Sequence, residues 1–320
     1  MKPLLEVKLL RTSFFTASGE VRAVDGVNFS VAAGKLMGLV GESGSGKTAS
    51  VLSIMRLLPE SARIVGGEII FEDQDLLKLS EPEMRHIRGA RIAMIFQEPM
   101  TSLNPVFTIG SQIGEAVRLH QHTNRGETRN RTIEALRMVG IADPERRIDD
   151  YPHQLSGGMR QRVMIAMALS CNPRLLIADE PTTALDVTIQ AQILDLIREL
   201  QVRLGLAVIL VTHDLGIVSE YADDVTILYA ARVMEQAPSA ELFRNPLNPY
   251  TRGLLESIPG MDSSRQRRLQ AIPGSIPSAL NPPAGCRFHP RCPRAIPQCS
   301  AAEPPLENRG PNHYVACIRA

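Results

Sequence analysis

The sequence lacks any apolar run that approaches the roughly 18 residues needed to cross a membrane, and no signal-peptide core follows Met1-Lys2-Pro3. It also lacks a net charge, because 35 Lys and Arg residues face 34 Asp and Glu residues and leave +1 at pH 7. A chain so balanced has no overall attraction to nucleic acid or to acidic substrates. No internal repeat divides the 320 residues. We therefore expect a soluble, cytosolic protein with one large domain and an appendage.

Cysteine is scarce until the end of the chain, where it becomes frequent. Of the five cysteines, Cys171 stands alone. The other four lie within the last 35 residues, at Cys286, Cys292, Cys299 and Cys317. Such crowding in a cytosolic protein indicates a metal site before it indicates disulfide bonds. Because 11 of the 23 prolines lie between Pro259 and Pro311, this tail should be rich in loops and need a staple.

One stretch matches the phosphate-loop pattern G-x-x-x-x-G-K-[ST], namely Gly41-Glu42-Ser43-Gly44-Ser45-Gly46-Lys47-Thr48. The apolar run Leu36–Val40 before it predicts a buried strand, and residues 49–55 after it predict a helix. Its glycines let the backbone curl so that successive N–H groups and a helix N-terminus converge on a polyphosphate. Lys47 adds a positive charge and Thr48 adds a hydroxyl for Mg²⁺. The stretch therefore predicts a nucleotide-binding site.

Strands and helices alternate along much of the remaining chain. Apolar runs predict buried strands at residues 91–96, 175–178 and 207–211. Apolar residues spaced as on one helix face predict helices around 109–117, 133–139, 156–170 and 189–204. The alternation indicates an α/β fold, with a parallel sheet covered by helices on both faces and a helical lobe between Gln97 and Leu175. The period-two pattern of Val27, Phe29 and Val31 predicts antiparallel strands before the phosphate loop, and beyond Val233 the pattern decays.

Two acidic residues, Asp179 and Glu180, close the apolar strand predicted at residues 175–178. In phosphate-loop ATPases a carboxylate at this strand end faces the Mg²⁺ that a hydroxyl such as that of Thr48 binds. The next acid can orient or deprotonate a water in line with the γ-phosphate. Alone, such a strand end is equally typical of a protein surface. Together with the phosphate loop it predicts a catalytic pair.

The run Leu155-Ser156-Gly157-Gly158-Met159-Arg160-Gln161-Arg162 resembles the LSGGQ signature of ATP-binding-cassette (ABC) ATPases and departs from it only at Met159. A Ser N-cap followed by two glycines exposes a helix N-terminus to an anion. The motifs of that family also follow one another here in the usual order: the phosphate loop, Gln97, the signature, Asp179-Glu180, Asp186 and His213. The resemblance covers about residues 4–260.

Longer runs narrow the resemblance to the importer ATPases for dipeptides, oligopeptides and nickel; they are residues 40–47, 94–105 and 177–188. Asn248-Pro249-Tyr250-Thr251 is similar to the His-Pro-Tyr-Thr element of those proteins, with Asn248 in place of the usual His. The resemblance implies an ABC-type nucleotide-binding domain at residues 1–235. This domain would contain a RecA-like parallel sheet, an antiparallel β subdomain and an inserted helical subdomain at about 98–168. Residues 236–320 would form a loop-rich C-terminal extension with the four-cysteine metal site.

The resemblance also implies roles for the catalytic motifs. Lys47 and the amides of residues 41–48 would hold the phosphates of ATP, and Thr48, Gln97 and Asp179 would organise Mg²⁺. Glu180 would be the general base, with His213 as a companion that senses the γ-phosphate. Gln97 would report the γ-phosphate to a membrane partner through the loop at residues 98–104.

Further residues are implied in the dimer and at the adenine. Ser156, Gly157 and Gly158 would close over ATP bound by the opposite subunit, and Asp186 would belong to a loop that crosses the dimer interface. Phe14, in preference to Phe15, would stack on the adenine, although either ring could instead belong to the core.

The spacing Cys286-x5-Cys292-x6-Cys299-x17-Cys317 resembles the C-terminal extension of the peptide importers, which can carry a 4Fe-4S cluster. Four thiolates could hold this cluster or a tetrahedral Zn²⁺, or could stay free, and spacing alone does not choose. The resemblance favours iron-sulfur in a structural role. Because such a cluster is anionic, we expect Arg287, Arg291 and Arg294 to be its electrostatic partners.

The sequence thus predicts the ATP-hydrolysing subunit of an importer that powers uptake of di- or oligopeptides, attached to the cytoplasmic face of the inner membrane. Its expected partners are a second, different ATPase subunit, two transmembrane permease subunits and, indirectly, an extracytoplasmic solute-binding protein. Nickel or another small solute is an alternative cargo. A soluble ABC ATPase that acts on ribosomes or DNA is an alternative of another class. It is disfavoured because the chain has one cassette and its ATPase lobe lacks the positive charge of a nucleic-acid binder.

Overall fold

The computed structural model describes residues 2–97, 102–183, 185–258 and 272–320. The chain divides into two compact units, one made of Met1–Leu77 with Val211–Ala320 and the other of Lys78–Leu210. Among the described residues, no helix is both long enough and apolar enough to cross a membrane.

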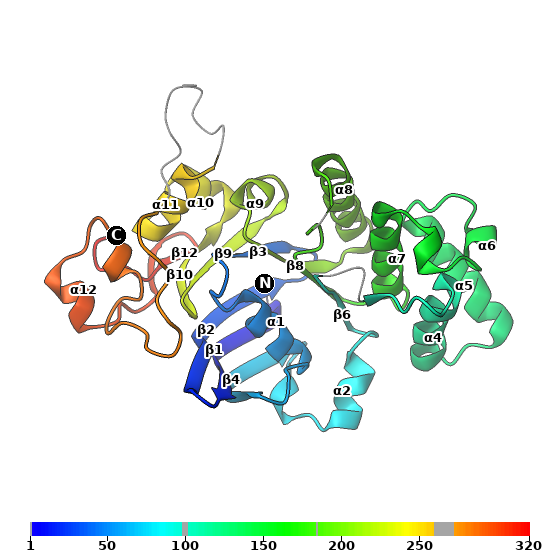
Figure 1. Cartoon of the computed structure of the whole chain (residues 1–320), viewed down its shortest axis with the longest axis horizontal. Helices are drawn as coiled ribbons and strands as arrows, with labels where there is room; N and C mark the ends of the chain where they lie inside the picture. Colours follow the sequence, from blue (N-terminus) through cyan, green and yellow to red (C-terminus); the bar gives the residue numbers. More distant parts are fainter. Residues whose placement is uncertain (1, 98–101, 184, 259–271) are drawn as a thin grey trace. The chain divides into compact units, whose positions relative to one another are not determined.

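The first unit contains an antiparallel sheet, as the sequence predicted. Its strands are β1 (Pro3–Thr16), β2 (Gly19–Ala32), β4 (Ala62–Phe71) and β5 (Gln74–Asp75), in the order β2-β1-β4-β5 (Figure 1). The alternating residues Val27, Phe29 and Val31 of β2 are buried and their neighbours are more exposed. Burial of one face therefore fixes the register of β2 against β1.

A second sheet in this unit carries the phosphate loop. Strand β3 (Leu36–Val40) is buried at every residue and runs parallel to β9 (Asp224–Tyr229), which pairs antiparallel with β10 (Arg232–Pro238). The sequence predicted β3 but gave no signal for β9. The decay begins later than Val233, because β10 continues to Pro238. Residues 272–320 are rich in loops, as expected, although two short strands of this tail extend the sheet. These are β12 (His313–Val315), which pairs with β10, and β11 (Glu307–Gly310), which pairs with β12.

The helices of the first unit are α1 (Lys47–Met55), α9 (Leu215–Tyr221), α10 (Ser239–Arg244), α11 (Pro249–Glu256) and the short α12 (Pro297–Ala301). One buried cluster joins residues of the sheet, the helices and the tail, among them Val40, Tyr229, Tyr250 and Phe288. The tail is therefore part of the core of this unit. The expected domain boundary between residues 235 and 236 stays a prediction. In the structure, strand β10 runs across this position.

The second unit holds the helical lobe. It contains α2 (Glu81–Ile87), β6 (Ile92–Ile95), α4 (Ile109–Gln121), α5 (Arg125–Met138), α6 (Pro144–Arg147), α7 (Gly157–Leu169), β7 (Leu175–Asp179) and α8 (Val187–Leu204). Strands β6 and β7 are parallel, and α4 to α7 come between them in the chain and group together in Figure 1. Strand β8 (Ala207–Thr212) runs from this unit into the first. The apolar runs and helix periods of the sequence predicted each of these elements except α2 and α6.

Candidate functional site

The phosphate loop leaves β3 and enters α1 in the first unit. A Cβ added at Gly41 would lie 2.2 Å from the carbonyl oxygen of Leu228, and one added at Gly46 would lie 2.3 Å from that of Ala23. Gly46 also has a φ of 101°, in the left-handed region that side chains avoid. The loop is thus pressed against neighbouring backbone on both sides, which holds its N–H groups in place.

Two side chains of the loop show how it is prepared for phosphate. The ammonium of Lys47 donates to the carbonyl oxygens of Gly41 and Glu42 at 2.8 and 3.1 Å, so it is folded back over the loop. The Ser45 hydroxyl is buried without a hydrogen-bond partner in the described chain, which is costly unless a ligand supplies one. Thr48 is exposed in the first turn of α1, where its hydroxyl can reach a cation. These groups fit a nucleotide with Mg²⁺.

The acidic pair lies in the second unit at the end of β7. Asp179 is its last residue and is only 2% exposed, whereas Glu180 follows with a left-handed φ of 45°. The Glu180 carboxylate accepts hydrogen bonds from Gln97 Nε2 at 3.0 Å and from Thr183 Oγ1 at 3.1 Å. Such unfavourable backbone angles concentrate at functional sites, where neighbours hold them. Gln97 and Glu180, both predicted to act in hydrolysis, are therefore brought together.

The signature run begins α7 in the same unit. Ser156 is its N-cap, and the Ser156 hydroxyl accepts from the N–H of Met159 at 3.4 Å. Ser156 and Gly157 are exposed while Leu155 is buried, so the helix start faces solvent from an anchored base. Gly158 faces α8, and a Cβ there would lie 2.9 Å from Ile189 Cγ2. The result is an open helix N-terminus of the kind that binds anions.

Asp186 and His213 take positions that the sequence left undefined. Asp186 is the N-cap of α8, and its Oδ1 accepts from the N–H of Ile189 at 3.0 Å. His213 follows β8 in the first unit and is exposed. Of the loop expected to carry the signal of Gln97, residues 98–101 lie outside the described residues.

The two adenine candidates differ in their surroundings. Phe14 is half-buried in β1, opposite Val21 of β2 and Ala62 of β4. Phe15 is 49% exposed, and the Arg63 guanidinium lies 5.9 Å from the centre of its ring. The choice between them stays a prediction.

Sequence reasoning missed a contact behind the phosphate loop. The Tyr250 hydroxyl accepts from the N–H of Glu42 at 3.2 Å, and the Tyr250 ring packs against Tyr229 and Phe288. Asn248 positions this tyrosine as N-cap of α11, where its Oδ1 accepts from the N–H of Tyr250 at 2.9 Å. The Asn-Pro-Tyr-Thr element was recognised in the sequence, but its residue types do not indicate that its tyrosine contacts the phosphate loop.

The four tail cysteines line one pocket of the first unit. Cys299 is buried, the other three are half-buried, and all are free thiols. Burial raises the pKa of Cys286 to about 11, although the N–H groups of Phe288 and His289 act against it. Within the described residues, no group of three or more His, Cys, Asp or Glu side chains is gathered closely enough to hold a metal ion.

The three arginines expected beside the cysteines have different partners. The Arg287 guanidinium donates to the Asp25 carboxylate at 2.8 Å, and Arg291 pairs with Glu42 at the same distance. The expectation was therefore wrong for these two, whose side chains reach carboxylates of β2 and of the phosphate loop. Arg294 bonds the carbonyl of Arg319, and its charge acts to lower the pKa of Cys292 against the larger effect of burial.

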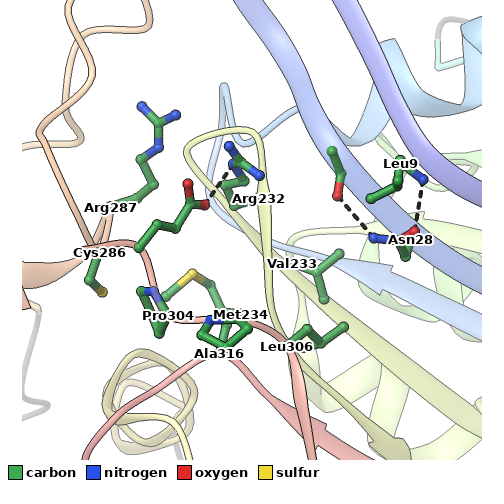
Figure 2. A pocket seen from close by; sticks show the side chains of 13 residues that line it. Leu9, Asn28, Arg232, Val233, Met234, Cys286, Arg287, Pro304, Leu306 and Ala316 are labelled. Atoms are coloured by element: carbon green, nitrogen blue, oxygen red, sulfur yellow. Dashed lines mark hydrogen bonds and ion pairs between the residues drawn. The ribbon is translucent and has the colours of Figure 1, made fainter. Parts of the chain in front are cut away.

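A second pocket shows how the tail joins the rest of this unit. Figure 2 shows Arg287 and Cys286 on one wall, Arg232 and Val233 of β10 on another, and Leu9 and Asn28 of the antiparallel sheet beyond them. Arg232 contacts Glu303 of the tail at 2.8 Å and Asp25 of β2 at 2.9 Å. Ion pairs thus bind the tail to both sheets of the unit.

Comparisons with known proteins agree with this arrangement. Residues 24–183 match the ABC transporter family, and residues 234–299 match the oligopeptide/dipeptide transporter C-terminal region. A probable peptide ABC transporter ATP-binding protein of Sinorhizobium fredii is 55% identical, covering 99% of this chain and 95% of that protein. An oligopeptide transport ATP-binding protein of Bacillus subtilis is 52% identical (99% and 97% covered), and a dipeptide transport ATP-binding protein of Escherichia coli is 50% identical (95% and 92%).

Solved structures give the same answer. A dimeric ATP-binding cassette in a post-hydrolysis state with ADP and phosphate matches with a TM-score of 0.66 and 27% identity, covering 73% of this chain and 98% of that one. A cassette from the ABC transporter complex of Clostridium perfringens matches with a TM-score of 0.65 and 28% identity, covering 77% and 92%. The fold that carries the phosphate loop, the acidic strand end and the exposed signature helix is thus that of known ABC cassettes. The chain belongs to the ABC transporter family of ATPases.

Proposed function

We propose that this chain is the ATP-hydrolysing subunit of an importer that carries di- or oligopeptides across the cytoplasmic membrane. The observation that carries the cargo class is the match of residues 234–299 to the oligopeptide/dipeptide transporter C-terminal region. The names of relatives at 50–55% identity support it, since those proteins are described as acting in peptide, oligopeptide or dipeptide transport. Nickel or another small solute is the alternative cargo.

Each motif has a task in the proposed hydrolysis. Lys47 and the N–H groups of residues 41–48 hold the phosphates, and Ser45 gains the partner that its buried hydroxyl lacks. Thr48, Gln97 and Asp179 offer the oxygen ligands that Mg²⁺ prefers, and the ion when bound neutralises charge on the phosphates. Glu180, oriented by Gln97 and Thr183, acts as the general base that orients and deprotonates the attacking water.

A single cassette needs a second copy or a sister subunit to complete its site. The exposed N-terminus of α7 supports this, because Ser156, Gly157 and Gly158 offer N–H groups to an anion from outside the unit. In the proposed cycle these residues close over ATP held by the opposite subunit, and hydrolysis reopens the pair. The expected partner is a different ATPase subunit. Within the ATP site of this chain, His213 senses the γ-phosphate.

The assembly would lie on the cytoplasmic face of the inner membrane, bound to two permease subunits and served by an extracytoplasmic solute-binding protein. Co-purified subunits in proteoliposomes test this, with ATP hydrolysis measured after addition of the binding protein. Stimulation by peptide-loaded binding protein is expected. Stimulation only by a nickel complex would assign the alternative cargo. Stimulation by nucleic acid without any permease would overturn the importer proposal.

We also propose that the tail holds a 4Fe-4S cluster with a structural role, Zn²⁺ being the alternative. The fit is one of donor chemistry, because four free thiols line a single pocket. Backbone N–H groups also reach three of them: those of Phe288 and His289 reach Cys286, that of Arg294 reaches Cys292, and that of Arg319 lies 3.3 Å from Cys317 Sγ. Such bonds stabilise thiolates, the form that binds metal.

Anaerobic purification tests the cluster. A brown protein with about four iron and four sulfide per chain is expected, and Cys299→Ser should lose the colour. Cys171→Ser is the matched control, since Cys171 lies in the other unit, and it should keep the colour. A colourless protein containing one zinc per chain would contradict the iron-sulfur assignment.

A further inference from the structure

One arginine of the tail reaches the phosphate loop. The Arg291 guanidinium forms a two-pronged ion pair with Glu42, with Nη1 at 2.8 Å from Oε2 and Nη2 at 3.2 Å from Oε1. The Arg291 side chain is 5% exposed and that of Glu42 is 26% exposed. Paired hydrogen bonds of this kind fix both position and orientation.

The remaining donors of Arg291 are also used. Nε donates to the carbonyl oxygen of Pro273 at 3.0 Å, Nη2 to that of Ile272 at 3.3 Å and Nη1 to the Tyr229 hydroxyl at 3.2 Å. The guanidinium also lies 5.7 Å from the centre of the Tyr229 ring. A side chain held by so many contacts is rigid, so it can transmit the position of the tail to the loop.

We propose that Arg291 is a positioning residue for ATP, which makes the C-terminal extension a working part of the nucleotide site. Glu42 stands inside the loop that must bind a polyanion, and its carboxylate repels phosphate unless it is neutralised. Arg291 cancels that charge from behind the loop. Together with the Tyr250 hydroxyl on the Glu42 N–H, it holds the first turn of the loop against the core.

The same contact ties nucleotide binding to the state of the tail. Arg291 ends the short 3₁₀ turn His289–Arg291 and directly precedes Cys292, one of the four thiols of the shared pocket. Anything that disorders this turn withdraws Arg291 from Glu42. Loss of order in the cysteine region therefore weakens ATP binding, although the cysteines themselves touch no nucleotide.

The test separates this role from general stability. Arg291→Met should raise the KM for ATP about tenfold, because the phosphate loop then carries an uncompensated carboxylate, and should leave kcat within about twofold. Adding Glu42→Gln to this variant removes the offending charge and should bring the KM back to within about threefold of the parent. Arg291→Lys, which keeps the charge without the fork, should fall between the two.

Arg287→Met is the matched control. It breaks a tail ion pair of similar burial, 9% side-chain exposure against 5%, but its partner Asp25 lies on β2 and not in the phosphate loop. It should lower the melting temperature without changing the KM for ATP. The proposal is overturned if Arg287→Met raises the KM as much as Arg291→Met, or if Glu42→Gln fails to restore binding. Should Arg291→Met not fold, Arg291→Lys with and without Glu42→Gln decides the same point.

Discussion

Glu180 is the residue at which local cost and chemistry coincide. Glu180 has a left-handed backbone conformation, which is strained for any residue other than Gly. Its carboxylate is held by hydrogen bonds from Gln97 and Thr183. A carboxylate fixed in this way need not reorganise when it meets a water molecule. The same hydrogen bonds restrain the side chain of this proposed base.

Glu180→Gln should lower ATP hydrolysis by about 10²–10⁴-fold, because an amide cannot accept the proton of the attacking water. ATP binding should persist, so gel filtration with the proposed partner ATPase subunit should show a trapped, ATP-bound dimer. Glu199→Gln is the control, since Glu199 pairs with Arg203 on the exposed face of α8 in the same unit. Hydrolysis unchanged in Glu180→Gln would remove this residue from its assigned role.

Two glycines of the phosphate loop separate the effect of a steric clash from the effect of backbone strain. Gly46→Ala should weaken ATP binding at least tenfold, because the new Cβ would lie 2.3 Å from the Ala23 carbonyl oxygen. Gly44→Ala shares the left-handed backbone, with φ of 77°, but a Cβ there has no atom within 4 Å. Its backbone strain of about 1–2 kcal/mol should lower the stability of the fold, and ATP binding should stay within about threefold of the parent. Titration with a fluorescent ATP analogue measures both, and equal losses would contradict the clash argument.

At this scale the sequence predicted residues whose chemistry is written in a local motif. Lys47, Asp179, Glu180 and Ser156 occupy the strand ends and helix starts that their motifs require. Arg291 was noticed for the wrong reason, because a charge beside a cysteine suggests a local partner. Its partner Glu42 is distant in the sequence. A contact between side chains that only the folded chain brings together leaves no periodic pattern in the sequence.

At the scale of elements, helix α11 depends on its N-cap residue, Asn248. Asn248 caps α11 with its Oδ1, while its Nδ2 donates to the carbonyl oxygens of Met234 at 3.1 Å and Ala316 at 3.3 Å. The residue is 1% exposed. It therefore joins a helix, a core strand and the tail.

Asn248→Ala should destabilise the protein by roughly 2–4 kcal/mol, since it removes an N-cap and the side-chain donor of the Ala316 carbonyl. The Met234 carbonyl keeps the N–H of Ala316 as a donor. Asn248→Ser should cost less, because a hydroxyl can still cap the helix. Chemical denaturation measures both free energies of unfolding. An equal loss in the two variants would show that capping contributes nothing here.

The elements that sequence analysis predicted share one property. Strands β3, β7 and β8 are continuous apolar runs, and α4, α5, α7 and α8 carry a clear apolar face or a capping residue. Strands β11 and β12 have four and three residues, too few to show a period. They exist because β10 offers an edge to pair with, a tertiary cause that a local window cannot contain.

At the scale of the whole molecule, the tail is a structural partner of the first unit. His313 of β12 places its Nε2 2.7 Å from Glu235 Oε1 of β10, and both side chains are buried. Glu235 also accepts the N–H groups of Leu247 and Asn248. One carboxylate thus collects donors from the tail and from the segment before α11.

His313→Ala should reduce stability by about 2–3 kcal/mol, because a buried carboxylate loses a strong hydrogen bond. The loss should be local, with faster amide hydrogen exchange in β10 and β12 and unchanged exchange in α4 and α5 of the other unit. His289→Ala is the control, since the hydrogen bond of the His289 ring within the described chain is to a nearby backbone carbonyl, that of Cys286. A uniform rise in exchange across the chain would refute the local role of this pair.

The ion pair between Arg291 and Glu42 joins residues 249 positions apart. During synthesis Glu42 is therefore made long before the arginine that neutralises it. If Arg291 compensates Glu42 as proposed, a chain that ends before residue 291 carries the phosphate loop with an uncompensated carboxylate, and it should bind ATP more weakly than the full chain.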